Sequence, residues 1–260
     1  PQLIITTAAA QEMLQELVEE LGLAIRVITP ESLASAPVAD IPGSAWASTS
    51  LAFLQYTSGS TAAPKGVMVG HQQLVANCTG MARAHQASPS DVAVSWLPLY
   101  HDMGLIGAVL SCLATGIRCY LLAPERFVQA PSLWLEAIHR YRASISFGPN
   151  FAFALCAKSI GAEQKKHWDL SAWRCVVNGA EPIDPQVLDE FATAFAEQGF
   201  SPLAFCPAFD QAEATLCLSA TPPRQAARYL WLEREALAQG RVQLAEHAGD
   251  SSSQCLVACG

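Results

Sequence analysis

Short, continuous apolar runs alternate along this chain with helix-spaced apolar residues, and this alternation constrains the fold more than any other feature. The runs predict strands at residues 24–28, 51–56, 92–97, 117–122, 144–147, 174–177 and 203–205. Between them, apolar residues three or four positions apart predict helices at 7–21, 71–86, 132–141 and 185–198. Strands that are apolar on both faces are typical of parallel sheets covered by helices. The sequence therefore predicts an α/β fold with largely parallel sheets.

The composition agrees with a folded enzyme body. Of the 260 residues, 51% are hydrophobic and only 15% are charged, which argues against disorder. The formal net charge is −8, so we expect no nucleic-acid partner. The nine cysteines show no Cys-x-x-Cys pair, a pattern typical of reduced, buried thiols in a cytoplasmic protein. The apolar stretch 105–123 is interrupted by Arg118 and is expected to be a buried helix followed by a strand, with no membrane span.

The segment 56–66 carries the strongest chemical signal. It reads Tyr-Thr-Ser-Gly-Ser-Thr-Ala-Ala-Pro-Lys-Gly and lies between two apolar runs. The N–H and hydroxyl groups of such small residues can converge on an anion, and the lysine adds a mobile positive charge. The sequence therefore predicts a phosphate-binding loop. Its expected ligands are Thr57, Ser58, Gly59, Ser60, Thr61 and Lys65.

Other interpretations of this loop fit less well. A Ser/Thr-rich surface turn is the plain alternative, but the flanking strands and the Pro-Lys-Gly ending disfavour it. A Walker loop is excluded because Pro64 precedes Lys65 and a strand follows. A hydrolase nucleophile elbow is excluded because neither Ser58 nor Ser60 has a glycine two positions before it.

In its strand–loop–strand setting, the loop resembles the signature of the adenylate-forming superfamily of acyl-CoA synthetases, peptide-synthetase adenylation domains and luciferases. The segment 96–107 contains His101-Asp102-Met103-Gly104 and is similar to the next motif of fatty acyl-AMP ligases in particular. The resemblance implies that His101 lies beside the reacting carboxylate and the phosphate path. Taken alone, a His-Asp pair after a strand is more often structural than catalytic.

Three later segments extend the resemblance. Residues 148–151 and 178–182 are similar to stretches that line the acyl tunnel and the adenine pocket, which implies nucleotide contacts from Gly179, Ala180 and Glu181. Residues 208–216 are similar to a motif that reads aromatic-Gly-x-Thr/Ala-Glu, in which Ala212 fits the acyl-AMP ligase version. There the resemblance implies that Phe209 stacks on adenine and that Glu213 holds Mg²⁺.

Asp210 departs from this motif, because the family has glycine there. If the protein is active, we expect Asp210 to adopt a glycine-like backbone conformation and to point its carboxylate away from the nucleotide phosphates. Asp210→Gly would then leave ATP affinity unchanged or tighter. The alternative is that Asp210 marks a decayed nucleotide site.

The resemblance also implies a domain organisation of two stacked, largely parallel α/β subdomains. Residues 1–88 are expected to form the first, with the phosphate loop, and residues 89–221 the second, with the acyl tunnel and the adenine pocket. Residues 222–254 resemble an insertion of fatty acyl-AMP ligases, with an ordinary surface excursion as the alternative. Residues 255–260 would begin a further subdomain, so we expect a central piece of a large N-terminal domain, cut at both ends.

The implied function is ATP-dependent activation of a fatty acid as acyl-AMP with release of pyrophosphate. The acyl group would then pass to an acyl carrier protein, in the cytoplasm. ATP and Mg²⁺ are the expected cofactors, and Lys65, His101 and Glu213 the expected catalytic residues. A CoA-forming acyl-CoA synthetase is one alternative, which the segment 222–254 disfavours. A degenerate nucleotide-binding domain of a megasynthase is the other, which Asp210 favours.

Overall fold

The computed structural model describes residues 2–34, 50–57 and 65–260. The chain divides into two compact units, Pro1–Trp46 and Ala47–Gly260. In the first unit, β1 (Leu3–Ile5) and β2 (Arg26–Ile28) pair in parallel, and α1 (Ala8–Glu20) connects them. The short helix α2 (Pro30–Ala34) follows β2. Val18 of α1 and Val27 of β2 are buried, so this helix packs on its small sheet through the apolar face that the sequence predicts.

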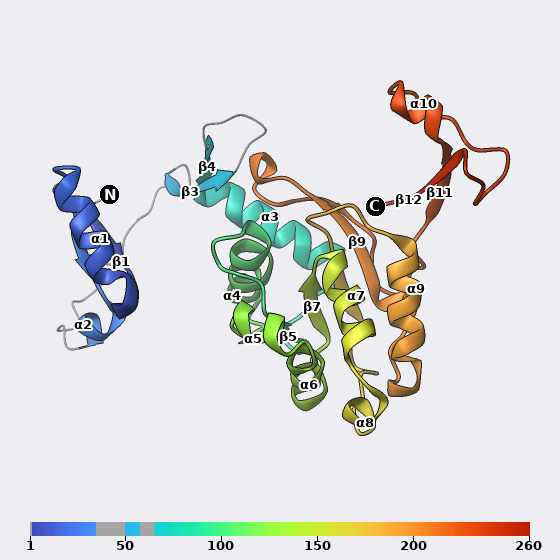
Figure 1. Ribbon diagram of the computed structural model, residues 1–260, viewed down its shortest axis with the longest axis horizontal. Helices are drawn as coiled ribbons and strands as arrows, with labels where there is room; N and C mark the ends of the chain where they lie inside the picture. The colour runs from blue at the N-terminus through green and yellow to red at the C-terminus, as the bar shows by residue number, and fades with distance from the viewer. Residues whose placement is uncertain (1, 35–49, 58–64) are drawn as a thin grey trace. The chain divides into compact units, whose positions relative to one another are not determined.

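A six-stranded sheet organises the second unit, with strand order β10-β9-β8-β7-β5-β6 (Figure 1). Five of its strands are parallel, and only β10 (Cys217–Ala220) pairs antiparallel, with β9. The parallel strands are β5 (Val92–Ser95), β6 (Arg118–Leu121), β7 (Ile145–Gly148), β8 (Cys175–Asn178) and β9 (Phe205–Asp210). The prediction of an α/β fold with a largely parallel sheet is confirmed.

Helices cover both faces of this sheet. As a result, β7 and β8 are buried at every residue. On one face, Trp134 of α6 (Ser132–Tyr141) donates a hydrogen bond from Nε1 to Oγ of Ser146 at 2.8 Å. Phe147, the next residue of β7, points to the opposite face. That face carries α3 (His71–Ala84), the π-helix η1 (Met103–Leu110) and α4 (Ser111–Thr115). The predicted buried helix and strand at 105–123 are therefore confirmed as η1, α4 and β6.

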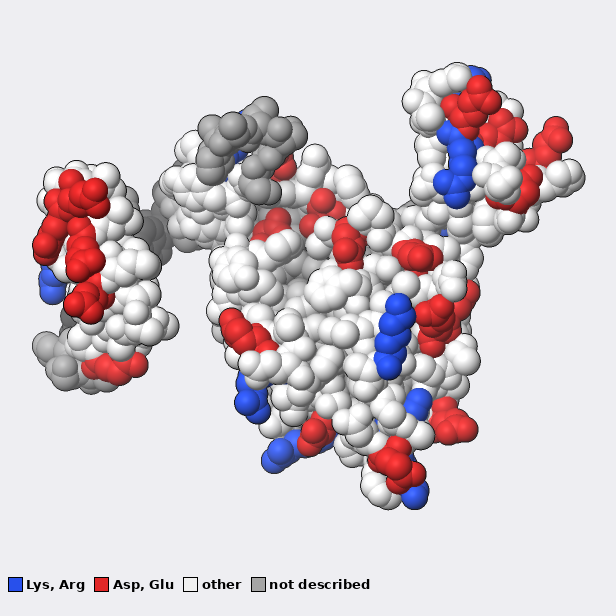
Figure 2. All heavy atoms as spheres, viewed as in Figure 1, with Lys and Arg blue, Asp and Glu red and all other residues white. Residues whose placement is uncertain are grey.

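The remaining short helices connect the strands. α7 (Asn150–Ser159) and α9 (Pro185–Ala194) contact each other. The others are α5 (Pro124–Gln129), α8 (Ala162–Lys165) and the 3-10 turns η2 (Ala196–Gln198), η3 (Pro202–Ala204) and η4 (Ala212–Ala214). None of the helices in the described ranges is both long and apolar enough to cross a membrane. On the face shown in Figure 2, Lys and Arg side chains are scattered and form no continuous basic area.

Two antiparallel hairpins stand outside the central sheet. β3 (Leu51–Thr57) and β4 (Lys65–Gly70) bracket residues 58–64. β11 (Tyr229–Glu233) and β12 (Ser253–Val257) pair near the end of the chain, with α10 (Arg234–Ala238) after β11. The expected boundary at 254/255 falls inside β12, and the expected boundary at 88/89 falls inside the unit Ala47–Gly260. The four expected domain ranges stay predictions.

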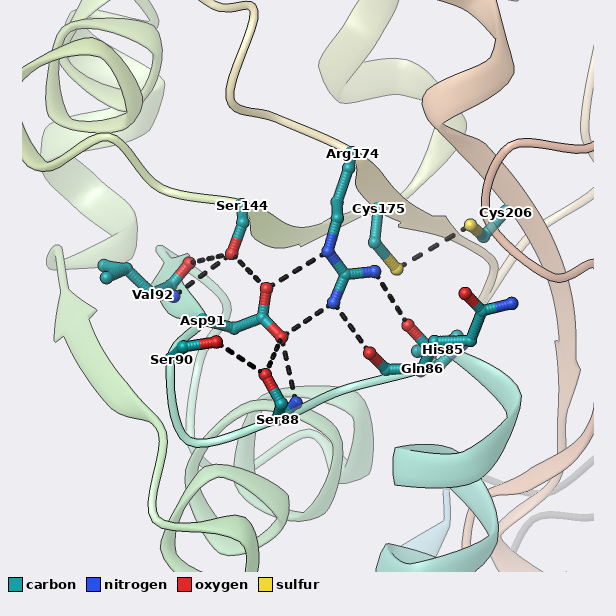
Figure 3. Close-up of polar contacts among 10 residues, drawn as sticks. All are labelled: His85, Gln86, Ser88, Ser90, Asp91, Val92, Ser144, Arg174, Cys175 and Cys206. Carbon is teal, nitrogen blue, oxygen red and sulfur yellow. Dashed lines mark hydrogen bonds and ion pairs between the residues drawn. The ribbon is translucent and has the colours of Figure 1, made fainter.

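A buried ion pair ties the end of α3 to the amino ends of the central strands (Figure 3). Nη2 of Arg174 lies 2.7 Å from Oδ2 of Asp91, and Oγ of Ser144 donates to the same carboxylate at 2.7 Å. Arg174 also donates to the carbonyl oxygens of His85 at 3.0 Å and Gln86 at 2.9 Å. Burial raises the pKa of Asp91, but the hydrogen bonds from Arg174 and Ser144 outweigh it and hold the pKa below its usual value. This network fixes α3 against the sheet.

Candidate functional site

The predicted motifs gather at one edge of the central sheet. β5, β7, β8 and β9 run parallel, and their carboxyl ends lead into residues 96–107, 148–151, 178–182 and 208–216. Because β6 and β7 flank β5 on opposite sides, the chain changes direction at β5, and in open α/β sheets ligands bind at the carboxyl edge beside such a switch point. Two hydrogen bonds link neighbouring segments, from Phe151 N–H to Glu181 at 2.7 Å and from Ala180 N–H to Asp210 at 2.9 Å.

The turn after β5 places His101 and Asp102 at this edge. Asp102 caps η1 by accepting the N–H of Met103 at 2.7 Å. A Cβ atom on Gly104 would lie 2.2 Å from the carbonyl oxygen of Pro98, so only glycine permits this tight return of the backbone. The turn is therefore shaped by Gly104 and held by Asp102.

The surroundings of His101 favour the protonated form of its side chain. Its Nδ1 lies 2.9 Å from Oδ1 of Asp102, and its side chain is about half exposed. The hydrogen bond to Asp102 raises the pKa of His101 against the effect of burial, and the negative charge of Asp210 adds to the rise. An exposed imidazole whose protonated form is favoured is suited to hold an anion.

The β3–β4 hairpin is joined to the same turn. The buried side chain of Gln55 donates from Nε2 to the carbonyl oxygen of Tyr100 at 3.2 Å. Thr57 and Lys65 lie opposite each other in the hairpin register, at the two described ends of the predicted phosphate loop. The other predicted phosphate ligands, Ser58, Gly59, Ser60 and Thr61, lie outside the described residues.

Asp210 does not have the expected glycine-like backbone. It lies in β9 opposite Cys217, and the described non-glycine residues with positive φ do not include it. Pairing in the sheet holds residue 210 extended, and the positive φ occurs across the site at Ala180, with φ 66°. The Ala180 N–H donates to Oδ1 of Asp210, so the carboxylate holds the predicted adenine segment in place. Burial raises the pKa of Asp210, and the Ala180 N–H opposes that rise.

Glycine at residue 179 fits the close approach of this segment to β9. A Cβ atom on Gly179 would lie 3.0 Å from the carbonyl oxygen of Ala208 and 3.1 Å from Oδ1 of Asp210. The backbone of the segment at the end of β8 thus approaches β9 closely, and a side chain at residue 179 would require these neighbouring atoms to shift.

Asn77 of α3 is a site residue that sequence reasoning missed. Its Nδ2 donates to the carbonyl oxygens of Ala214 at 3.3 Å and Cys217 at 3.0 Å, and its Oδ1 accepts the N–H of Cys217 at 3.1 Å. These bonds hold the turn that carries Glu213, in which Thr215 has a φ of 77°, a strained value for a β-branched residue. The sequence feature that could have identified Asn77 is its position as a polar residue one helical turn before the buried Met81.

The exposed residues of this turn fit a nucleotide with its metal ion. Phe209 is 53% exposed at the end of β9, so its ring is accessible for stacking. Glu213 is exposed in η4, while Ala212 beside it is buried. The described residues contain no group of three potential metal ligands. Mg²⁺ is commonly held by one or two carboxylates together with substrate phosphates, so a single Glu213 suits it.

A narrow apolar cavity leads inward from this edge. Gly179 and Asp210 lie in its wall at the carboxyl edge, and the rest of the wall is largely apolar. It includes Met103 and Gly107 of η1, Phe147 of β7, Val177 of β8, Ala208 of β9, and Leu216. The wall thus contains Phe147 and none of the residues 148–151, which were expected along the acyl tunnel.

The family model described as "AMP-binding enzyme" matches residues 1–230. The chain belongs to the AMP-binding enzyme family. Two members of this adenylate-forming family are 40% identical to it. They are the medium-chain-fatty-acid–[acyl-carrier-protein] ligase JamA of Moorena producens, over 82% of this chain and 36% of that protein, and TtuA of Teredinibacter turnerae, over 81% of this chain and 32% of that protein.

Solved structures of this AMP-binding family share the fold. A fatty acyl-adenylate ligase of Legionella pneumophila, in complex with acyl adenylate and pyrophosphate, has a TM-score of 0.85 and 37% identity over all of this chain and 45% of that one. A structure from a study of fatty acyl-adenylate ligases of E. coli and L. pneumophila has a TM-score of 0.93 and 31% identity over all of this chain and 47% of that one. The chain therefore spans less than half the length of these AMP-binding relatives.

Proposed function

We propose that the protein containing this chain activates a medium-chain fatty acid as its acyl-adenylate and transfers the acyl group to an acyl carrier protein. The observation that carries the proposal is the meeting of the predicted motifs at one carboxyl edge, where charged groups lie beside an apolar wall that includes Phe147 and Val177. A carboxylic acid with an alkyl chain has this division into a charged head and an apolar tail. JamA and TtuA, the relatives at 40% identity, are named for this substrate and this acceptor.

In the proposed reaction, a carboxylate oxygen attacks the α-phosphorus of ATP and pyrophosphate leaves. Different site residues would bind different parts of the substrates. Such a transfer depends on positioning and on neutralising phosphate charge. Lys65 and the loop residues that follow Thr57 would bind the β- and γ-phosphates. Glu213 would hold Mg²⁺, which neutralises phosphate charge when bound. Phe209 would stack on adenine.

The substrate carboxylate would lie near His101 at the carboxyl edge. The favoured protonated form of His101 attracts this carboxylate and offsets the negative charges of Asp102 and Asp210. The alkyl chain would lie against the apolar side chains below this edge, where each buried methylene contributes about 0.8 kcal/mol. Substrate binding would therefore be directed by charge at the edge and by hydrophobic burial below it.

The β11–α10–β12 element supports the choice of acceptor. It forms a two-stranded sheet of its own, outside the central sheet, within the segment that resembles the fatty acyl-AMP ligase insertion. We propose that this element disfavours CoA as acceptor. All nine cysteines are free, which agrees with the proposed cytoplasmic location.

Pyrophosphate exchange by the full-length protein against a panel of fatty acids tests the proposal. We expect exchange that depends on a medium-chain acid and acyl transfer to an acyl carrier protein but not to CoA. Glu213→Gln should lower exchange at least about tenfold through loss of the metal ligand, while Glu197→Gln, an exposed change in η2, should leave it unchanged. ATP binding without exchange would instead indicate a degenerate domain, and a CoA thioester product a CoA-forming synthetase.

A further inference from the structure

The turn between β9 and β10 holds a strained backbone at Thr215. Its φ of 77° and ψ of −55° lie close to those of the classic γ-turn, which is rare and strained. A β-branched side chain makes this conformation less favourable still. Thr215 is buried, so the turn is not a loose surface loop. Strained residues of this kind persist only where the surrounding structure holds them, and they are often found at functional sites.

Bonds within the turn fix the backbone around Glu213. The Gln211 N–H donates to the carbonyl oxygen of Leu216 at 2.8 Å and closes the turn. The Thr215 N–H donates to the carbonyl oxygen of Ala212 at 2.9 Å. Glu213 lies between these residues, in the middle of η4. The position of its backbone therefore depends on Thr215 keeping its unusual conformation.

The side chain of Asn77 holds the turn from outside, on both sides of Thr215. Its Nδ2 donates to the carbonyl oxygen of Ala214 at 3.3 Å and to that of Cys217 at 3.0 Å. Its Oδ1 accepts the Cys217 N–H at 3.1 Å, so the carboxamide binds both backbone groups of Cys217 as a neighbouring strand would. Both donor hydrogens of the carboxamide and its acceptor oxygen are used, a set that only an amide side chain supplies.

We propose that Asn77 is a positioning residue for the metal ion, because it holds the strained turn and with it the backbone of Glu213. This inference rests on the proposed function, since it takes Glu213 as the ligand of Mg²⁺. Once Asn77 is removed, Thr215 is free to relax toward a negative φ, and Glu213, two residues before it, moves as well. Loss of a group that orients a metal ligand typically lowers metal affinity about 10- to 100-fold.

Manganese binding to the full-length protein tests the inference. The measurement is the Kd of Mn²⁺ by electron paramagnetic resonance, in the presence of a non-hydrolysable ATP analogue. Asn77→Ala should raise this Kd at least about tenfold. Asn77→Asp, which also serves if Asn77→Ala does not fold, places a carboxylate against two carbonyl oxygens and should lose as much. Thr79→Ala is the matched control, an exposed change on the same helix, and should alter the Kd less than about twofold.

Thr215→Gly separates a positioning role from a general loss of stability. Glycine adopts a positive φ without strain, so the turn then depends less on Asn77. Adding Asn77→Ala to Thr215→Gly should therefore raise the Kd of Mn²⁺ by less than about threefold. A change in the turn cannot repair a loss of α3 packing. An equal rise in both backgrounds would thus show that Asn77 acts through stability alone, and it would overturn the inference.

The outcomes also separate this inference from the proposed function. Glu213→Gln should raise the Kd by itself, and adding Asn77→Ala should raise it no further, because both changes act on one ligand. An unchanged Kd in folded Asn77→Ala protein overturns the inference and leaves the proposed function intact. Absence of Mn²⁺ binding by the unaltered protein, or an unchanged Kd in Glu213→Gln, overturns the inference at its starting point. Failure of the unaltered protein to form acyl-AMP from any fatty acid overturns the proposed function itself, whatever the metal measurements show.

Discussion

At the scale of single residues, Asp210 acts through its hydrogen bond to the Ala180 N–H. Asp210→Gly removes this bond and frees the segment at the end of β8, so we expect ATP affinity to fall about fivefold, which corresponds to about 1 kcal/mol. Asp210→Asn keeps an acceptor oxygen and should lose less than about twofold. Calorimetric titration of the full-length proteins with a non-hydrolysable ATP analogue measures the difference. The sequence alone favours the opposite result for Asp210→Gly, and tighter binding would restore that first expectation.

His85 predicts acid sensitivity. Burial and the charge of Arg174 lower its pKa from 6.5 to about 4. Between pH 6.5 and about pH 4, the imidazole of His85 is protonated in the unfolded chain and neutral in the folded chain. Stability therefore falls across this window, by about 2 kcal/mol at about pH 5. Urea unfolding at a series of pH values should show a weaker pH dependence in His85→Gln. His167→Gln, an exposed change, should retain the original slope.

At the scale of elements, the Asp91–Arg174 pair decides how firmly α3 is held on the sheet. Their side chains are only 8% and 20% exposed. Arg174→Met leaves Asp91 buried without its cation and should cost about 3 kcal/mol in the free energy of unfolding. Arg142→Met breaks an ion pair with Asp169 in which the side chains are 60% and 46% exposed, and should cost less than about 1 kcal/mol. Equal losses in the two variants, by urea denaturation, would show that the network does not anchor α3.

The helices and strands predicted from local apolar patterns are largely confirmed. Some of their boundaries are wrong, because packing sets where those elements begin and end. The strand predicted at 92–97 is β5, and the helix predicted at 71–86 is α3, which ends at Ala84. The strand predicted at 203–205 is instead β9, Phe205–Asp210, because Pro202–Ala204 forms a 3-10 turn. The π-helix of η1 was not predicted, since it depends on the tight return past Pro98 at Gly104.

At the scale of the whole molecule, the chain covers 36% of the length of JamA, so further residues are expected to complete the active site. We predict that these 260 residues alone show at least about a hundredfold less pyrophosphate exchange than the full-length protein. The reason is that, under the proposed function, the described groups would supply adenine stacking and one metal ligand, while charge stabilisation at the α-phosphate is usually the largest contribution to such catalysis. Comparable exchange by the two proteins would show that the site in this chain is sufficient.

The sequence by itself determined the class of fold and the place of the motifs. Apolar strands alternating with helices favour a largely parallel sheet, and residues that follow parallel strands meet at one edge. Only the tertiary structure decided which of these residues touch. The bonds from Asn77 to Cys217, from Gln55 to Tyr100 and from Ala180 to Asp210 join residues far apart in the chain. Asn77 reaches Cys217 only because α3 contacts β10, since contacts between distant segments depend on packing that no local pattern contains.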